Sequence, residues 1–181
     1  MRYNNSMSRL RRVPFGADNF LSVLEGIEGG FAIFAGIIIG LSFEGVDRRL
    51  LVITAGISII VNAVNASSVR YASEHYLDEL DGQENRRWLS GYFTPAFIEF
   101  LVYGITSVIS ILPLILIKSD FWAVATMTLI TIVFLYAAGW YRGNLLIRRR
   151  RILDGLETAG LGIVIILAGA GSGWILSHLV A

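Results

Sequence analysis

Five long apolar runs occupy nearly the whole of this 181-residue chain, and they limit what it can fold into. A helix rises about 1.5 Å per residue, so about 20 apolar residues cross the roughly 30 Å hydrocarbon core of a bilayer. Backbone groups in lipid must bond within their own segment, which favours helices. The sequence therefore predicts an all-α integral membrane protein, a single domain over residues 1–181. Its five spans are expected near 20–43, 50–72, 92–117, 121–142 and 156–179.

The basic residues predict how these spans are oriented, because cytoplasmic loops are enriched in Lys and Arg. With the N-terminus in the cytoplasm, twelve of the fifteen basic residues fall on the cytoplasmic side. These are Arg2, Arg9, Arg11, Arg12, Arg70, Arg86, Arg87, Arg142, Arg148, Arg149, Arg150 and Arg151. Arg48, Arg49 and Lys118 fall on the other side. We expect the N-terminus in the cytoplasm and the C-terminus outside.

Composition narrows the function classes. The chain has no cysteine, which excludes thiolate metal sites and cysteine nucleophiles, and its only histidines are His75 and His178. A net charge of +1 argues against a nucleic-acid partner. No phosphate loop, nucleophile–base pair or cofactor motif is present, so we expect neither an enzyme nor a bound cofactor. The basic start lacks a cleavable signal, and a prokaryotic cell membrane is the expected location.

The first span carries two acids, Glu25 and Glu28, three residues apart on one side of a helix. A charged carboxylate within a bilayer costs on the order of 2.5–3.5 kcal/mol, so a cation or a proton is its expected partner. Glycines and alanines surround the pair, and they allow another helix or a hydrated ion to approach. The alternative is that Asp18 and Glu25 lie at the membrane interface and are solvated.

Polar residues in the next two spans could complete a site. Asn62 and Asn65 share a face of the second span, where they could line a polar path or bond to a neighbouring helix. Arg70, near the cytoplasmic end of that span, could pair with Glu25 or Glu28, or extend to the headgroups. Glu99 is the third membrane acid, expected at a depth similar to that of Glu25.

The link over 72–90 contains acid and histidine pairs at helical i,i+4 spacing, Glu74 with Asp78 and His75 with Glu79. They could be metal ligands or belong to a solvated helical extension. In the last span, glycines between Gly160 and Gly173 favour close helix packing.

The run Glu25-Gly26-Ile27-Glu28-Gly29-Gly30-Phe31-Ala32-Ile33-Phe34-Ala35-Gly36 resembles the first span of the vacuolar iron transporter (VIT) family of Fe(II) and Mn(II) transporters. That family has Asp-Gly, four variable residues, then Phe-Ala and a glycine. The resemblance places Glu25 at the family's metal-path aspartate. Two prolines, Pro95 and Pro113, have the spacing often found in the family's third span, and five spans in this orientation also agree. The resemblance implies a homodimer in which the first spans meet.

The second span departs from the family, which has a Ser-Met-x-x-Gly-Glu-Tyr type of motif there. The corresponding run is Asn65-Ala66-Ser67-Ser68-Val69-Arg70-Tyr71, so Ala66 replaces the methionine and Arg70 replaces the glutamate. The family's cytoplasmic metal-binding insertion is also missing between the second and third spans, so its ion-collecting glutamates have no counterparts here.

Together these features predict a transporter that exports Fe(II) or Mn(II) from the cytoplasm in exchange for protons. Oxygen ligands without thiolates suit these metals. The expected metal-site residues are Glu25, Glu28, Glu99, Asn62 and Asn65. The alternative is a divergent relative that moves another solute or serves as a membrane scaffold, with Arg70 neutralising the acids. An ion pair between Arg70 and Glu25 or Glu28 inside the bundle would favour this alternative.

Overall fold

The computed structural model describes residues 16–43, 45–82, 88–145 and 150–180, and every regular element in these ranges is a helix. In order they are α1 (Ala17–Glu28), η2 (Gly29–Ile33), α2 (Phe34–Ser42), α3 (Arg48–Leu80), η3 (Leu89–Phe93), α4 (Thr94–Leu116), α5 (Asp120–Leu145) and α6 (Arg151–Val180). The π-helical turns η2 and η3 are continuous with their neighbours. The result is five helices long and apolar enough to cross a membrane, which confirms the predicted class.

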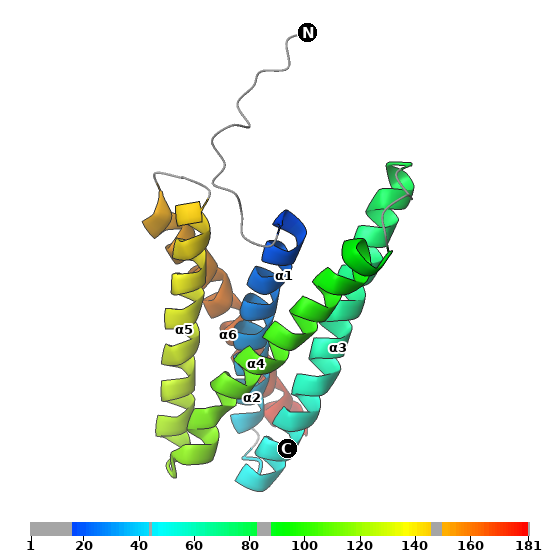
Figure 1. The fold of residues 1–181 in the computed structure, drawn as a ribbon. Coiled ribbons are helices and arrows are strands. Elements are labelled where there is room, and N and C mark those ends of the chain that lie inside the picture. Colours follow the sequence, from blue (N-terminus) through cyan, green and yellow to red (C-terminus); the bar gives the residue numbers. More distant parts are fainter. Residues whose placement is uncertain (1–15, 44, 83–87, 146–149, 181) are drawn as a thin grey trace.

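The predicted spans agree closely with the helices, except in two places. The second helix continues from the predicted end at 72 to Leu80, and the fifth begins at Arg151 instead of 156. Hydropathy locates the part of a helix that lies in lipid, not the polar turns that continue beyond it. At 33 residues, α3 is about 50 Å long and exceeds the hydrocarbon thickness. Its polar end extends past the neighbouring helices (Figure 1).

The beginning of α1 and the end of α6 lie at opposite ends of the bundle, as an odd number of spans requires (Figure 1). We name the end where α1 begins the arginine-rich end, because Arg70, Arg142, Arg150 and Arg151 lie toward it. The other eight arginines used for the orientation lie outside the described residues. The cytoplasmic location of this end therefore stays a prediction from the sequence.

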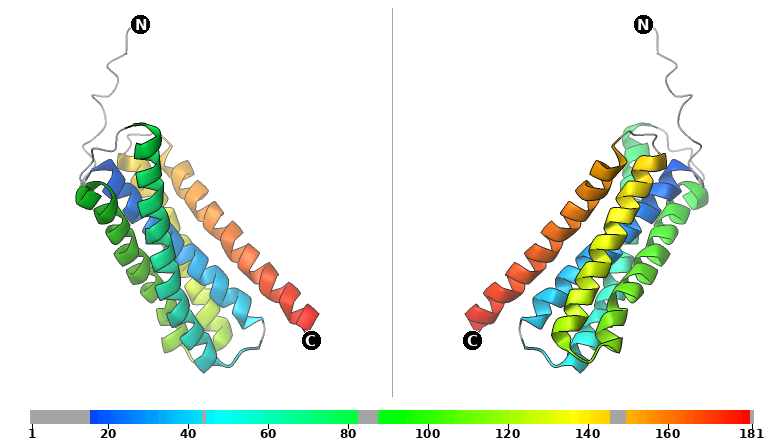
Figure 2. Two further views of the ribbon diagram at one scale, coloured as in Figure 1. Left: turned by 90° about the vertical axis from the view of Figure 1, so that its right-hand side faces the viewer. Right: turned by 90° about the vertical axis from the view of Figure 1, so that its left-hand side faces the viewer.

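The first span, α1–η2–α2, is the central element of the bundle. Of its most apolar stretch, 61% is buried inside the chain, compared with 44% or less in the other spans. Helix α4 crosses it on one side and α6 packs on another (Figures 1 and 2). Both helices approach it closely because its contact faces carry glycine.

The contact between α2 and α6 joins two pairs of glycines. Gly36 and Gly40 of α2 face Gly169 and Gly173 of α6, and a Cβ added to Gly169 or Gly173 would overlap a backbone carbonyl of α2. Small residues four apart let helix backbones touch in lipid, where packing replaces the hydrophobic effect as the force between helices. This confirms the expected packing role of glycines in the last span.

Arg48 holds the opposite end of the bundle together. Its guanidinium donates to the carbonyls of Leu114, Ile117 and Lys118, the last at 2.7 Å, and lies 3.3 Å from the Asp120 carboxylate. The last carbonyls of a helix lack N–H partners within it and form its negative pole, so a cation is favoured there. Pro113 lies three residues before the end of α4 at Leu116.

The contact between α2 and α6 predicts that substitutions at two nearby glycines of α6, Gly169 and Gly171, have different effects on the free energy of unfolding. Gly169→Leu should lower the free energy of unfolding by about 1–3 kcal/mol, the usual cost of overpacking. Gly171→Leu should have little effect, because nothing lies within 4 Å of a Cβ added there. Thermal unfolding of both variants in detergent measures this difference, and equal melting temperatures would contradict the described α2–α6 contact.

Candidate functional site

The two acids of the first span face different neighbours. The Glu25 carboxylate lies 3.2 Å from Arg70 of α3, and its side chain is 40% exposed. Glu28 is half-buried, and its charged neighbours are Arg142 of α5 and Glu25. Arg142 also approaches Glu157 of α6, at 3.9 Å. Spacing alone placed both acids on one side of a helix, but in the bundle Glu25 pairs with Arg70 of α3, whereas the positive charge acting on Glu28 is that of Arg142 of α5.

Arg70 is the centre of a group of charged side chains that we name the charged cluster; its other members are Glu25, Glu74 and Glu99. It is 7% exposed, although it carries a permanent charge. It lies 2.8 Å from Glu74, one turn later on α3, and donates to the backbone carbonyl of Asp18 at 3.2 Å. The Glu25 pair and the hydrogen bond to Asp18 fasten α3 to α1, whereas the Glu74 pair lies within α3. The sequence left open whether Arg70 pairs inside the bundle or extends outward, and the structure places it inside.

Glu99 brings a third carboxylate to this region from α4. It is 6% exposed, and its Oε2 atom has no hydrogen-bond partner among the described residues. Its charged neighbours are Glu25 and Arg70. The carboxylates of Glu25 and Glu74 thus contact one guanidinium, and the Glu99 carboxylate lies within its electrostatic influence without contacting it in the described residues. The cluster holds more negative than positive charge when all of these groups are ionised.

The glycines beside the acids accommodate α4. A Cβ at Gly26 would lie 2.9 Å from Val102, one at Gly29 would lie 2.7 Å from the Tyr103 ring, and one at Gly30 would overlap the Thr106 hydroxyl. The sequence allowed either a helix or a hydrated ion to approach here, and in this conformation a helix does.

Two hydroxyls of α4 bond to the backbone of the first span across this contact. Ser107 donates to the Gly30 carbonyl at 3.1 Å. The Thr106 hydroxyl lies 3.1 Å from the Gly26 carbonyl and shares its proton with the Val102 carbonyl of its own helix, at 2.8 Å. The π-helical turn η2 begins at Gly29, and such turns disturb the regular carbonyl ladder of a helix and are frequent at functional sites. We did not predict these hydroxyl residues. Their recurrence every three to four residues after Glu99, within an apolar run, was the available signal.

Asn62 and Asn65 are not brought to the acids in this conformation. Asn62 is half-buried and Asn65 is exposed on α3, and within the described ranges no hydrogen bond joins either amide to Glu25, Glu28 or Glu99. The assignment of these two residues to a metal site stays a prediction.

The link over 72–90 is a helical extension as far as Leu80, with its side chains engaged in contacts. The Tyr92 hydroxyl donates to Asp78 at 2.8 Å, and His75 lies 3.3 Å from Glu79 while packing against the rings of Tyr71 and Tyr92. Across the described part of the chain, no three acidic or histidine side chains gather closely enough to hold a metal ion. These residues instead tie the end of α3 to the beginning of the third span.

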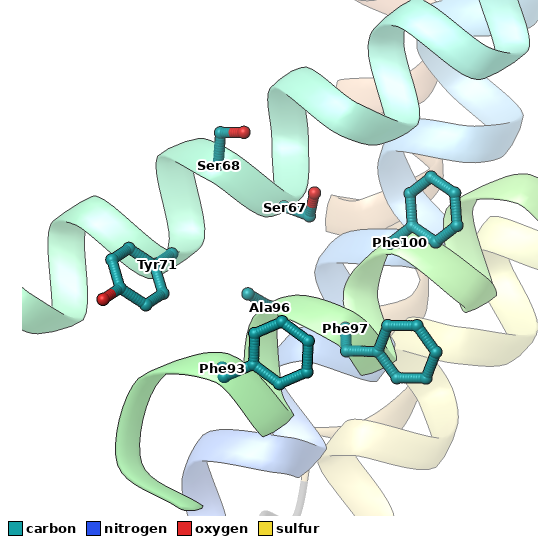
Figure 3. A pocket seen from close by; sticks show the side chains of 7 residues that line it. All are labelled: Ser67, Ser68, Tyr71, Phe93, Ala96, Phe97 and Phe100. Carbon is teal, nitrogen blue, oxygen red and sulfur yellow. The ribbon is translucent and has the colours of Figure 1, made fainter. Parts of the chain in front are cut away.

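A separate hollow of about 280 Å³ lies between α3 and α4. Figure 3 shows the residues that line it: Ser67, Ser68 and Tyr71 from α3, and Phe93, Ala96, Phe97 and Phe100 from η3 and α4. None of these residues is an acid, so this hollow is distinct from the charged cluster around Arg70.

Comparisons of the chain with protein-family models, with curated proteins and with solved structures find no match. The functional interpretation of the candidate site therefore rests on its geometry and chemistry.

The ion pairs of Arg70 predict that removing the guanidinium lowers the free energy of unfolding. Fully buried pairs lose about 3–5 kcal/mol when one partner is removed and surface pairs about 0–1. With Glu25 partly exposed, Arg70→Leu should lower the free energy of unfolding by about 1–3 kcal/mol, between these limits. Arg49→Leu is the matched control, since Arg49 is exposed on the same helix. Equal thermal stability of the two variants in detergent would show that the Arg70 pairs do not hold α3 to α1.

Proposed function

We propose that this protein is a transmembrane transporter of a divalent metal, Fe(II) or Mn(II), which exports the metal from the cytoplasm by proton exchange. The observation that carries the proposal is the excess of carboxylate over guanidinium around Arg70, between α1, α3 and α4 of a membrane bundle. Ionisable groups in membrane helices are costly and typically mark ion or proton pathways.

The chemistry of the cluster suits a hard cation. Its ligands are oxygens, and the chain offers no thiolate, which favours Mn(II) or Fe(II) over copper or zinc. A carboxylate can be neutralised by a metal ion or by a proton, so one acid can bind metal from one side and release it when protonated from the other. We assign metal binding to Glu25 and Glu99, with Glu28 beside them.

In this mechanism, Arg70 is a covalently attached counter-ion that occupies Glu25 until a metal ion arrives. In the described conformation it pairs with Glu25 and Glu74 at once, and its single charge offsets only one of the two carboxylates. An arriving metal ion would displace the guanidinium from Glu25, while the Glu74 pair on the same helix keeps it charge-compensated. Asn62 and Asn65 would join the site only if α3 rotated toward α1.

The proposal includes a homodimer in the bilayer, in which first spans meet, and a prokaryotic cell membrane as its location. Because other helices of the same chain cover most of the first span, the dimer contact would use its exposed strip with Leu21 and Ile33. The arginine-rich end would face the cytoplasm, and the metal would be substrate rather than cofactor.

A second candidate function is favoured by the Arg70–Glu25 ion pair itself. A fixed internal guanidinium can occupy permanently the place that a metal ion would take. The protein would then move another solute or serve as a membrane scaffold. The two candidates differ in whether Arg70 leaves Glu25.

Metal flux in proteoliposomes tests the first candidate. Under an imposed pH gradient, wild-type protein should move Mn(II) or Fe(II), and Glu25→Gln should reduce this flux about tenfold or more, since a lost charge-assisted contact is worth about 1.5–3 kcal/mol. Glu79→Gln, on the polar extension of α3, should transport like wild type. Normal flux through the Glu25→Gln variant would remove Glu25 from the site.

Arg70→Gln separates the two candidates. If Arg70 is a displaceable counter-ion, wild-type protein transports metal and the variant does so with altered metal affinity. If Arg70 is a fixed counter-ion, wild-type protein transports neither metal, and flux emerges only when the guanidinium is removed. The same proteoliposome assay measures both outcomes.

A further inference from the structure

A row of hydroxyl side chains follows Glu99 along the inner face of α4. We name it the hydroxyl row; its members are Tyr103, Thr106, Ser107 and Ser110. Tyr103, Thr106 and Ser110 follow Glu99 at steps of three to four residues, and Ser107 lies four residues after Tyr103, so all four share one side of the helix. Each is 7% exposed or less. From Glu99 to Ser110 the row extends about 16 Å, half of the hydrocarbon thickness. It therefore leads from the charged cluster toward the opposite end of the bundle.

The hydroxyl row has unused hydrogen-bonding capacity. The Tyr103 hydroxyl and the Ser110 Oγ are buried without a hydrogen-bond partner among the described residues, as is the Glu99 Oε2 atom. Buried polar groups in proteins nearly always have partners, and unsatisfied ones call for an explanation such as a water or an ion. Three such atoms on one side of α4 point to a polar ligand that reaches this contact.

The surface that faces the hydroxyl row offers backbone oxygens. The first span meets α4 with Gly26, Gly29 and Gly30, so no side chain of these residues stands between the helices. Two hydroxyl–carbonyl hydrogen bonds connect the two surfaces, and both are between neutral groups. When the helices part, the freed carbonyls and hydroxyls become a double row of oxygen ligands. Hydroxyl, carbonyl and carboxylate oxygens are ligands for hard cations, and irregular helices in transporters present carbonyls in this way.

We propose that the contact between α1–η2 and α4 is the intramembrane passage of the transported cation, opened to water when the two segments separate. Tyr103, Thr106 and Ser107 of the hydroxyl row line one side, and the carbonyls of Gly26 and Gly30 line the other. Ser110 continues the row one turn further along α4. This inference rests on the proposed cation transport, but it assigns the route to the interior of one chain. Figure 1 shows α4 crossing the first span along this contact.

Cysteine accessibility tests the passage without a flux measurement. The chain has no cysteine, so single variants Ser107→Cys and Ser110→Cys carry the only thiol. A charged, membrane-impermeant thiosulfonate reacts with the thiolate, which forms in water and not in lipid. Val108→Cys is the control, because Val108 is 50% exposed on the outer side of α4, where lipid surrounds the bundle. Full reaction of each variant after denaturation confirms that its thiol is intact.

We expect both inner cysteines to react about tenfold faster than the Val108→Cys control in membranes, and Mn(II) to slow them. Two residues of the row are used so that a local folding defect in one variant does not decide the result. Inner cysteines as unreactive as the control, or reaction rates unaffected by Mn(II), would overturn the passage. If metal flux persists in either of these cases, the transporter proposal stands and its ion takes another route. If Mn(II) slows the reaction of the inner cysteines but no metal flux is found, the contact between α1–η2 and α4 binds a cation and the proposed transport function is wrong.

Discussion

The small residues of the first span determine where the other helices lie. In a bilayer, lipid tails are as apolar as the helices, so association depends on close packing and polar contacts. Gly26, Gly29 and Gly30 admit α4 on one side, while Gly36 and Gly40 admit α6 on another. A single helix can meet two partners at backbone distance only if both contact faces lack bulky side chains. This constraint makes the first span central, and it brings the first-span acids close to those of α3 and α4.

In the charged cluster, the ion pairs that stabilise the bundle also reduce the negative charge that a cation would bind. Arg70 of α3 stabilises the α1–α3 contact because it pairs with Glu25 and donates to the Asp18 carbonyl of α1. Its ion pairs with Glu25 and Glu74 reduce the negative charge available to an arriving cation. Glu99 shifts the charge of the cluster toward negative. Its carboxylate interacts electrostatically with Arg70 but forms no ion pair with it in the described part of the chain. In the proposed transporter, this arrangement would leave a carboxylate without a paired guanidinium available to a cation.

The sequence predicted the helical class, the five spans and three members of the cluster, Glu25, Arg70 and Glu99, because the cost of polar groups in lipid makes hydropathy informative. It assigned Glu74 to the link over 72–90 and missed its pair with Arg70. It could not predict which partner each acid would take, since Glu25 and Glu28 have similar local surroundings and differ only through the packing of α3 and α5. Asn62 and Asn65 illustrate the same limit: their spacing fixed a shared helix face, but not the direction in which that face would point. The hydroxyl row was overlooked because serine and threonine are common in membrane helices and only their register on α4 distinguishes them.

Polar groups are distributed along the bundle in a way that fits an ion route through a membrane. The charged cluster around Arg70 lies toward the arginine-rich end, where the cost of ionisation is lower than at the membrane centre. Neutral hydroxyls continue from it along α4 toward the membrane centre, where that cost is highest. A passage lined by carboxylates along its whole length would hold a divalent cation too tightly to release it, because conduction requires binding weak enough for exit. Neutral oxygens can replace the hydration shell of an ion without trapping it. Acids at the entrance would therefore select and collect the cation, and the hydroxyl row would let it move on.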